Sequence, residues 1–219
     1  MYTLILFVHG GAGAVALAGA AGAIGSRLFG WPHRVHILAG NAFTLGMIGV
    51  ALTGLVITYI NPSLFLLSLA VFLLYLVIAG WRYAKARGGM QSAGDKVFAV
   101  GFAVIFAAMI AYGAWRGMDG NTMGWVMAVF GTIGLLQALA DARGAFGQPV
   151  KGKTRIAAHL IRMLGGTIGV TTAFLLIQLQ TNSVWVWLGP TALLTPLIVI
   201  WSRRVRGGWL PKRAPKLTR

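Results

Sequence analysis

Apolar residues in this chain are grouped into seven long runs, separated by charged residues or by turn formers such as Pro32 and the Asn61-Pro62 pair. A helix that crosses the hydrocarbon core of a bilayer needs roughly 17 to 25 mostly apolar residues, and each run is close to that length. The pattern therefore predicts an all-α bundle of seven transmembrane helices. The predicted spans are 3–24, 35–60, 64–80, 97–115, 123–140, 156–179 and 184–201.

The composition also indicates a membrane protein. Hydrophobic residues make up 58% of the 219 residues and charged residues only 10%, whereas charged residues make up about 25% of a typical soluble domain. The chain has no cysteine, which excludes disulfides, thiolate metal sites and iron–sulfur clusters. We expect a polytopic transmembrane domain over residues 1–202, followed by a basic, disordered cytoplasmic tail over residues 203–219.

Positive charge is concentrated on one side of the predicted bundle. The chain carries 19 Lys and Arg against 3 Asp and Glu, a net charge of +16. When successive connections are placed on alternating sides, all of these Lys and Arg except Arg116 belong to the side of the C-terminus. Because short cytoplasmic loops retain such residues, we expect an N-terminus outside and a C-terminus inside. This rule accounts for the charge, so we expect anionic lipids at the basic face and no nucleic acid partner.

Small residues predict where the helices approach one another. Glycine and alanine at four-residue spacing let a neighbouring helix contact the backbone. We therefore expect the ridges of the first and sixth spans to be buried and to offer contacts to a larger membrane complex. The third span, 64–80, has bulky residues on every side and is expected to face lipid. The small residues are Gly10, Ala14, Ala18 and Gly22 in the first span and Gly165 and Gly169 in the sixth.

The acidic residues give little sign of catalysis. Asp95 and Asp119 lie in predicted loops, and Asp141 lies at the inner end of the fifth span beside Arg143, where we expect a surface or capping role. An ionisable group inside the hydrocarbon usually marks function, but no carboxylate lies in the middle of a predicted span. This argues against hydrolysis by paired carboxylates and against ion transport through a carboxylate. The seventh span also has no lysine for a retinal Schiff base.

Four histidines remain as candidates for a site. His9 lies about two turns into the first span from the outside. His33 and His36 begin the second span from the inside, and His159 begins the sixth. At about 1.5 Å of rise per residue, His36 and His159 reach a similar depth. Their imidazoles could therefore be the two axial ligands of one haem b.

Residues near these two histidines are suited to that cofactor. Gly40 follows His36 by one turn, and Gly165 and Gly166 follow His159 by about two turns. All three glycines could clear the space that a porphyrin face requires. Arginines at the same end could pair with the haem propionates through charge-assisted hydrogen bonds. These arginines are Arg34, Arg155 and Arg162.

Other interpretations of the histidines stay open. His33 and His36 share a helix face and could form a three-imidazole zinc site with His159, although the chain has no HExxH-type motif. Each of the three could instead form an ordinary hydrogen bond at the membrane interface. For His9 we expect a hydrogen bond to a neighbouring helix, with a ligand or proton-relay role as the alternative.

Short motifs in the second, sixth and seventh spans accompany His9 and the glycine-rich first span. They are Pro32-His33-Arg34, Ala158-His159, Arg162-Met163-Leu164-Gly165, Thr171-Thr172-Ala173-Phe174, Trp187-Leu188-Gly189-Pro190-Thr191 and Thr195-Pro196-Leu197-Ile198. Over nearly the whole chain, this arrangement resembles domain of unknown function family 2306 or a close relative. The resemblance implies a bacterial inner-membrane protein with seven or eight spans and recurrent histidines, but no established activity. The family pattern has glycine soon after the His-Arg pair, where this chain has Val35-His36, so His33 is the substitute ligand.

These observations lead to three classes of function. Foremost we expect an accessory or scaffold subunit of a larger membrane complex, without a hydrolase or transferase motif. The first alternative is a b-type haem-binding or haem-handling protein with ligands near the cytoplasmic face. Any enzymatic activity would then be that of a haem-dependent membrane oxidoreductase. The second alternative is a transporter of small solutes, which predicts a polar interior cavity that Thr171, Thr172 and Gln178 could line.

Overall fold

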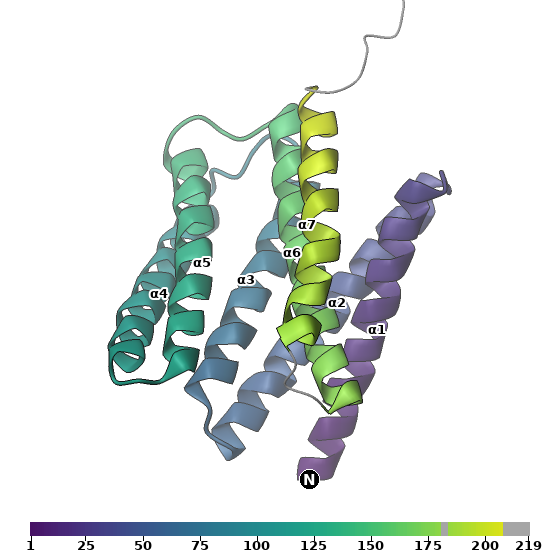
Figure 1. Cartoon of the computed structure of the whole chain (residues 1–219). Coiled ribbons are helices and arrows are strands. Elements are labelled where there is room, and N and C mark those ends of the chain that lie inside the picture. The colour runs from purple at the N-terminus through teal and green to yellow at the C-terminus, as the bar shows by residue number, and fades with distance from the viewer. Residues whose placement is uncertain (181–183, 208–219) are drawn as a thin grey trace, which may run out of the picture.

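The computed structural model describes residues 1–180 and 184–207 and is helical over almost all of them (Figure 1). Within these residues it has seven helices, joined by short connections. Six of them, α1 to α6, are long and apolar enough to cross a membrane. The predicted all-helical fold and membrane character are therefore confirmed. The helices are α1 (Tyr2–Leu28), α2 (His33–Ile60), α3 (Leu64–Lys85), α4 (Ala93–Met118), α5 (Thr122–Phe146), α6 (Gly152–Leu179) and α7 (Val184–Arg206).

Most helices extend beyond the predicted spans, chiefly at the end that carries the basic residues. α4 begins at Ala93 instead of Val97 because Ser92 and Asp95 form a capping box. The Ser92 hydroxyl accepts a hydrogen bond from the Asp95 backbone N–H, and the Asp95 carboxylate accepts one from the Ser92 backbone N–H. Asp95 also forms an ion pair with Arg82 of α3. Such contacts give hydrogen-bond partners to backbone N–H groups in the first turn of α4, a helix that begins outside the hydrocarbon.

Two outer hairpins flank the central helices α3 and α6 (Figure 1). α1 packs along α2 at one side of the bundle, and α4 packs along α5 at the other. α3 lies between these hairpins and contacts α2, α5 and α6, while α7 packs against α6. Both helices of the α4–α5 hairpin contact α3: α5 packs along it, and Phe98, Phe102 and Phe106 of α4 lie against the Tyr75 ring. The centre of the molecule is therefore α3.

The second half of α3 is buried among its neighbours, so the prediction that the third span faces lipid is wrong there, whereas Leu64 and Leu66 at its start are exposed. The side chains of Leu73 and Val77 are at most 8% exposed. They fill space that glycines of α6 leave open: a Cβ on Gly166 would lie 3.0 Å from Val77, and a Cβ on Gly169 would overlap with Leu73. Bulky residues on α3 thus match small residues on the facing helix. The sequence of one helix alone does not reveal this complementarity.

The contact between α1 and α2 is made by backbone against backbone. A Cβ on Gly19 of α1 would overlap with the backbone nitrogen of Phe43. On the other side, a Cβ on Gly46 of α2 would lie 2.7 Å from the carbonyl oxygen of Ala12. Real Cβ atoms do not approach other atoms so closely, so glycine at these two positions is what allows the close approach.

The ridge of small residues predicted on α1 lies on a different face from this contact. Gly22 is partly buried, whereas Gly10, Ala14 and Ala18 are exposed. A Cβ built on Gly10 meets nothing within 4 Å. The prediction that this ridge is buried is therefore wrong, because α1 is rotated so that Gly19 faces α2 instead. Spacing identifies a ridge, but it does not determine which of several ridges a partner uses.

The basic residues gather at one end of the bundle. This end, at the top of Figure 1, holds the C-termini of α1, α3, α5 and α7. Arg116 lies at the opposite end, near the C-terminus of α4, and Arg162 lies inside α6. α7 continues through Arg203 to Arg206, so the first residues of the predicted disordered tail are helical. The remainder of that tail, residues 208–219, lies outside the described residues.

Candidate functional site

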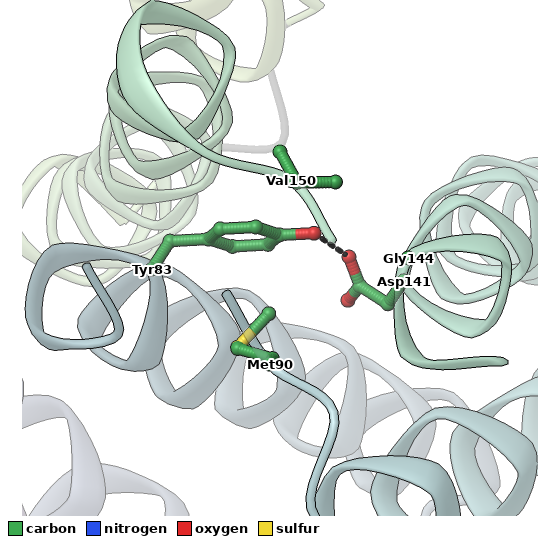
Figure 2. Close-up of a pocket in the computed structure, with 5 residues that line it drawn as sticks. All are labelled: Tyr83, Met90, Asp141, Gly144 and Val150. Carbon is green, nitrogen blue, oxygen red and sulfur yellow. Dashed lines mark hydrogen bonds between the residues drawn. The ribbon is translucent and has the colours of Figure 1, made fainter. Parts of the chain in front are cut away.

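A carboxylate and a guanidinium form an ion pair in the interior of the bundle. Asp141 of α5 and Arg162 of α6 are each 4% exposed, and Arg162 Nη2 donates a hydrogen bond to Asp141 Oδ1 at 2.5 Å. Two tyrosines of α3 complete the group: the Tyr83 hydroxyl donates to Oδ1 at 2.7 Å and the Tyr75 hydroxyl to Oδ2 at 2.6 Å. Figure 2 shows the Tyr83 hydroxyl directed at Asp141. We call these four residues the Asp141 cluster.

Asp141 is therefore not at the surface beside Arg143, and this corrects the prediction from the sequence. Its partner Arg162 lies 21 residues further along, on a different helix. A single charge in hydrocarbon is costly, whereas a hydrogen-bonded pair of opposite charges is tolerated. The signal that could have found the pair is Arg162 itself. An arginine well inside span 156–179 needs an anion, and Asp141 ends the preceding span.

Arg162 is also the residue for which the sequence predicts a propionate contact, and the structure gives it a different environment. Besides its bond to Asp141, its guanidinium lies over the Tyr83 ring at 4.6 Å from the centroid. Its Nη1 donates to the carbonyl oxygen of Ala158 at 3.3 Å. Arg162 is thus held in the Asp141 cluster instead of facing the basic end of the bundle.

His159 of α6 is fixed by a hydrogen bond to α3. Its Nδ1 lies 2.8 Å from the carbonyl oxygen of Gly80. Because a carbonyl oxygen can only accept, Nδ1 carries the proton and the Nε2 lone pair is left available. Gly80 also sets the spacing of the two helices, since a Cβ there would lie 3.2 Å from both Arg162 Cβ and Met163 Cγ.

His36 of α2 has the same arrangement. Its Nδ1 lies 3.1 Å from the carbonyl oxygen of Ala23 in α1 and 3.3 Å from the Ser26 hydroxyl. That hydroxyl already donates to the Ala23 carbonyl at 2.7 Å, so the His36 Nδ1–H is the donor to both groups. The Nε2 lone pair is again available. His33, one turn earlier, is exposed, and its ring centroid lies 6.1 Å from that of His36.

His36 of α2 and His159 of α6 both lie in the half of the bundle that carries the basic residues (Figure 1). A Cβ built on Gly40, one turn after His36, meets nothing within 4 Å. The space predicted beside Gly165 and Gly166 is instead occupied by side chains of α2 and α3. The predicted clearance is therefore present on α2 and absent at these two glycines of α6.

Two arginines lie at the same end of the bundle as His159. Arg155, one turn before it on α6, donates from Nη1 to the carbonyl oxygens of Tyr83 and Ala84 at the end of α3. Arg27 is exposed at the end of α1, a helix that also contacts α6.

His9 forms the interhelical hydrogen bond predicted from the sequence. Its Nδ1 lies 2.8 Å from the Thr53 hydroxyl of α2. That hydroxyl donates to the carbonyl oxygen of Gly49 at 2.6 Å, so the His9 Nδ1–H is the donor. The half-buried His9 ring lies against Gly54. His9 thus belongs to the half of the bundle opposite to His36 and His159.

A lateral cavity of about 320 Å³ lies between α3, α4 and α5. Its lining is apolar apart from the side chains of Ser68 and Tyr112. The Ser68 hydroxyl donates to the carbonyl oxygen of Leu64. This cavity gives no support to the transporter interpretation, which predicts a polar interior lined by α6.

The predicted three-imidazole zinc site is not formed. Among residues 1–180 and 184–207, no three His, Asp or Glu side chains come together in a group that could hold a metal ion. The His33 and His36 rings lie 6.1 Å apart, centroid to centroid, and these two histidines do not form a group of three with His159.

Comparison with known proteins adds no assignment: no model of a protein family, no curated protein and no solved structure matches this chain. The resemblance to domain of unknown function family 2306 therefore stays a prediction. The functional inference rests on the residues of the site and on their geometry.

Proposed function

We propose that this chain is an electron-transfer protein of the bacterial inner membrane that binds one haem b, with His36 and His159 as the axial ligands. The observation that carries the proposal is the geometry that these two histidines share. Each donates its Nδ1–H to a backbone carbonyl of a neighbouring helix, Ala23 at 3.1 Å and Gly80 at 2.8 Å. Each imidazole therefore presents Nε2 as an available lone-pair donor.

This arrangement is the usual one for metal-bound histidine. A ligating imidazole nearly always donates its other ring N–H to a carbonyl, a carboxylate or water, which fixes the tautomer and the ring orientation. His36 and His159 come from different helices and lie in the same half of the bundle (Figure 1). Two such imidazoles meet the ligand requirement of a six-coordinate haem iron.

Ligation by two histidines suits electron transfer. A haem whose two axial positions are filled by the protein exchanges single electrons and offers no open position to a substrate. In this chain His36 and His159 would hold the iron, and Gly40 leaves room beside His36. Arg27 and Arg155 supply positive charge for the propionates. Arg155 is one of the arginines predicted from the sequence, and Arg27 takes the place of Arg162, which is held by Asp141.

The placement in the membrane is part of the same proposal. α7 joins α1 to α6 as the seventh span, with the N-terminus outside. The basic end of the bundle faces the cytoplasm and its anionic lipids, because cytoplasmic loops retain Lys and Arg during insertion. The resemblance to domain of unknown function family 2306 supports a bacterial inner membrane. The haem then lies near the cytoplasmic face.

A visible spectrum of the full chain, purified in detergent from cells supplied with haem, tests the proposal. We expect a Soret band and, after reduction with dithionite, sharp α and β bands. His36→Ala and His159→Ala each remove one ligand, so each variant is expected to lose the six-coordinate spectrum. His9→Ala is the matched control, because it removes an imidazole of the other half of the bundle and is expected to keep the spectrum.

Two results would contradict this assignment. A folded wild-type protein without a Soret band removes the haem proposal entirely. If His36→Ala and His159→Ala each keep the six-coordinate spectrum, neither histidine is an axial ligand. The His33→Ala variant distinguishes the substitute ligand: loss of the spectrum in this variant, together with its retention in His36→Ala, would assign the second ligand to His33.

A second candidate function is that of an accessory or scaffold subunit in a larger membrane complex. The observation that favours it is the exposed ridge of α1, formed by Gly10, Ala14 and Ala18. In lipid, small residues at such spacing favour close contact with another helix. A partner that co-purifies with a colourless wild-type chain and is lost in Ala14→Leu would support this candidate. Recovery of the wild-type chain alone would count against it.

A further inference from the structure

The Asp141 cluster includes Arg162 of α6, the helix that also carries His159. Arg162 follows His159 by three residues on α6, so the two side chains are about one turn apart. Gly80 contacts both: its carbonyl oxygen accepts the His159 Nδ1–H, and a Cβ on it would lie 3.2 Å from Arg162 Cβ. A change of charge at Arg162 or Asp141 therefore acts close to His159.

The ion pair is balanced and screened very little by solvent. Both partners are 4% exposed, and charges in a low-dielectric interior act more strongly than charges in water. While both charges are present, their fields largely cancel at a distance. If one charge is removed, the field of the other is no longer compensated. Tyr75 and Tyr83 donate to the carboxylate and stabilise its negative charge.

We infer that the balance between the two charges of the Asp141–Arg162 pair holds the reduction potential of the proposed haem site at its wild-type value, and this inference rests on the proposed function. An oxidised haem carries one more positive charge than a reduced haem, so a nearby positive charge favours the reduced form. A nearby negative charge favours the oxidised form. Neither Asp141 nor Arg162 is a ligand, and both act through the field at His159 and through the register of α6. Both are positioning residues.

Potentiometric titration of the full chain, monitored by the visible spectrum, tests this inference with two variants. Asp141→Asn keeps the shape of the side chain and removes the negative charge. Arg162 stays positive because a guanidinium does not lose its proton in proteins, so we expect a shift to a more positive potential. Arg162→Gln removes the positive charge and leaves a carboxylate stabilised by Tyr75 and Tyr83, so we expect a shift to a more negative potential.

The control is Asp119→Asn, which makes the same charge change at an exposed residue at the opposite end of the bundle. It is expected to keep the wild-type potential. An unchanged six-coordinate spectrum in each variant separates an effect of charge from loss of a ligand. The potential is expected to shift in a different direction in each variant. If one variant cannot be expressed, the shift of the other still tests the inference.

Opposite shifts in Asp141→Asn and Arg162→Gln support the inference. A variant that retains the spectrum and the wild-type potential overturns it, and so do two shifts in the same direction. In those cases the haem proposal still stands. A folded, colourless wild-type chain overturns both proposals, so the two failures are distinguishable.

Discussion

The α1–α2 hairpin and the interior formed by α3, α5 and α6 are held together in opposite ways. Between α1 and α2, Gly19 and Gly46 bring the two backbones into direct contact. In the interior, Tyr75 and Tyr83 of α3 donate hydrogen bonds to Asp141, which is paired with Arg162. Because lipid provides little hydrophobic driving force between helices, close packing and polar pairing have to supply the stability. The hairpin relies on the first of these, and the interior adds the second.

The two regions should therefore respond to different kinds of substitution. Added volume disrupts an interface in which backbones already touch. Removal of one charge disrupts an interface whose remaining charge has no solvent to stabilise it. Three substitutions measure this difference, and all three can be followed by the free energy of unfolding of the purified chain in mixed detergent micelles.

Asp141→Ala is expected to have the largest effect. It leaves the Arg162 guanidinium buried without its anion, and breaking a buried pair in this way costs about 3–5 kcal/mol. The double variant Asp141→Ala/Arg162→Ala should recover part of this loss, because it leaves no single charge. A loss below about 1 kcal/mol, the range of an exposed pair, would show that water reaches the cluster.

Gly19→Ala is expected to have the next largest effect. Its Cβ would overlap with the Phe43 backbone, and added volume in a packed interface costs about 1–3 kcal/mol. Gly10→Ala is the matched control on the same helix, since a Cβ there meets nothing within 4 Å. Its effect should stay within about 0.5 kcal/mol. Equal effects of the two substitutions would mean that α1 and α2 can separate without cost.

Tyr75→Phe is expected to have a smaller effect, of about 1 kcal/mol. It removes the hydroxyl that donates to Asp141 Oδ2, whereas Oδ1 has both Tyr83 and Arg162 as donors. Tyr83→Phe should therefore cost less than Tyr75→Phe. The opposite order of the two unfolding free energies would contradict this account of the Asp141 cluster.

The helices could be predicted from the sequence because a membrane helix satisfies its own backbone within one continuous apolar run. The length of each run and its polar ends determine where a helix lies, without reference to any other helix. These features depend on one segment at a time.

The packing could not be predicted because it depends on two segments together. Asp141 has Arg143 as its neighbour in sequence, yet its partner is Arg162 on another helix. The carbonyl oxygens of Ala23 and Gly80 that orient the two histidines carry no signature in the sequence, since every residue has a carbonyl. These contacts arise only from the rotation and register of the packed helices.

The order of the Asp141 cluster along the chain bears on how the protein is made. The tyrosines of α3 reach the membrane first, Asp141 follows with α5, and Arg162 arrives last with α6. Until α6 enters, the acid has hydroxyl donors but no cation beside it. Addition of α6 supplies that cation, and the ion pair then joins α5 to α6.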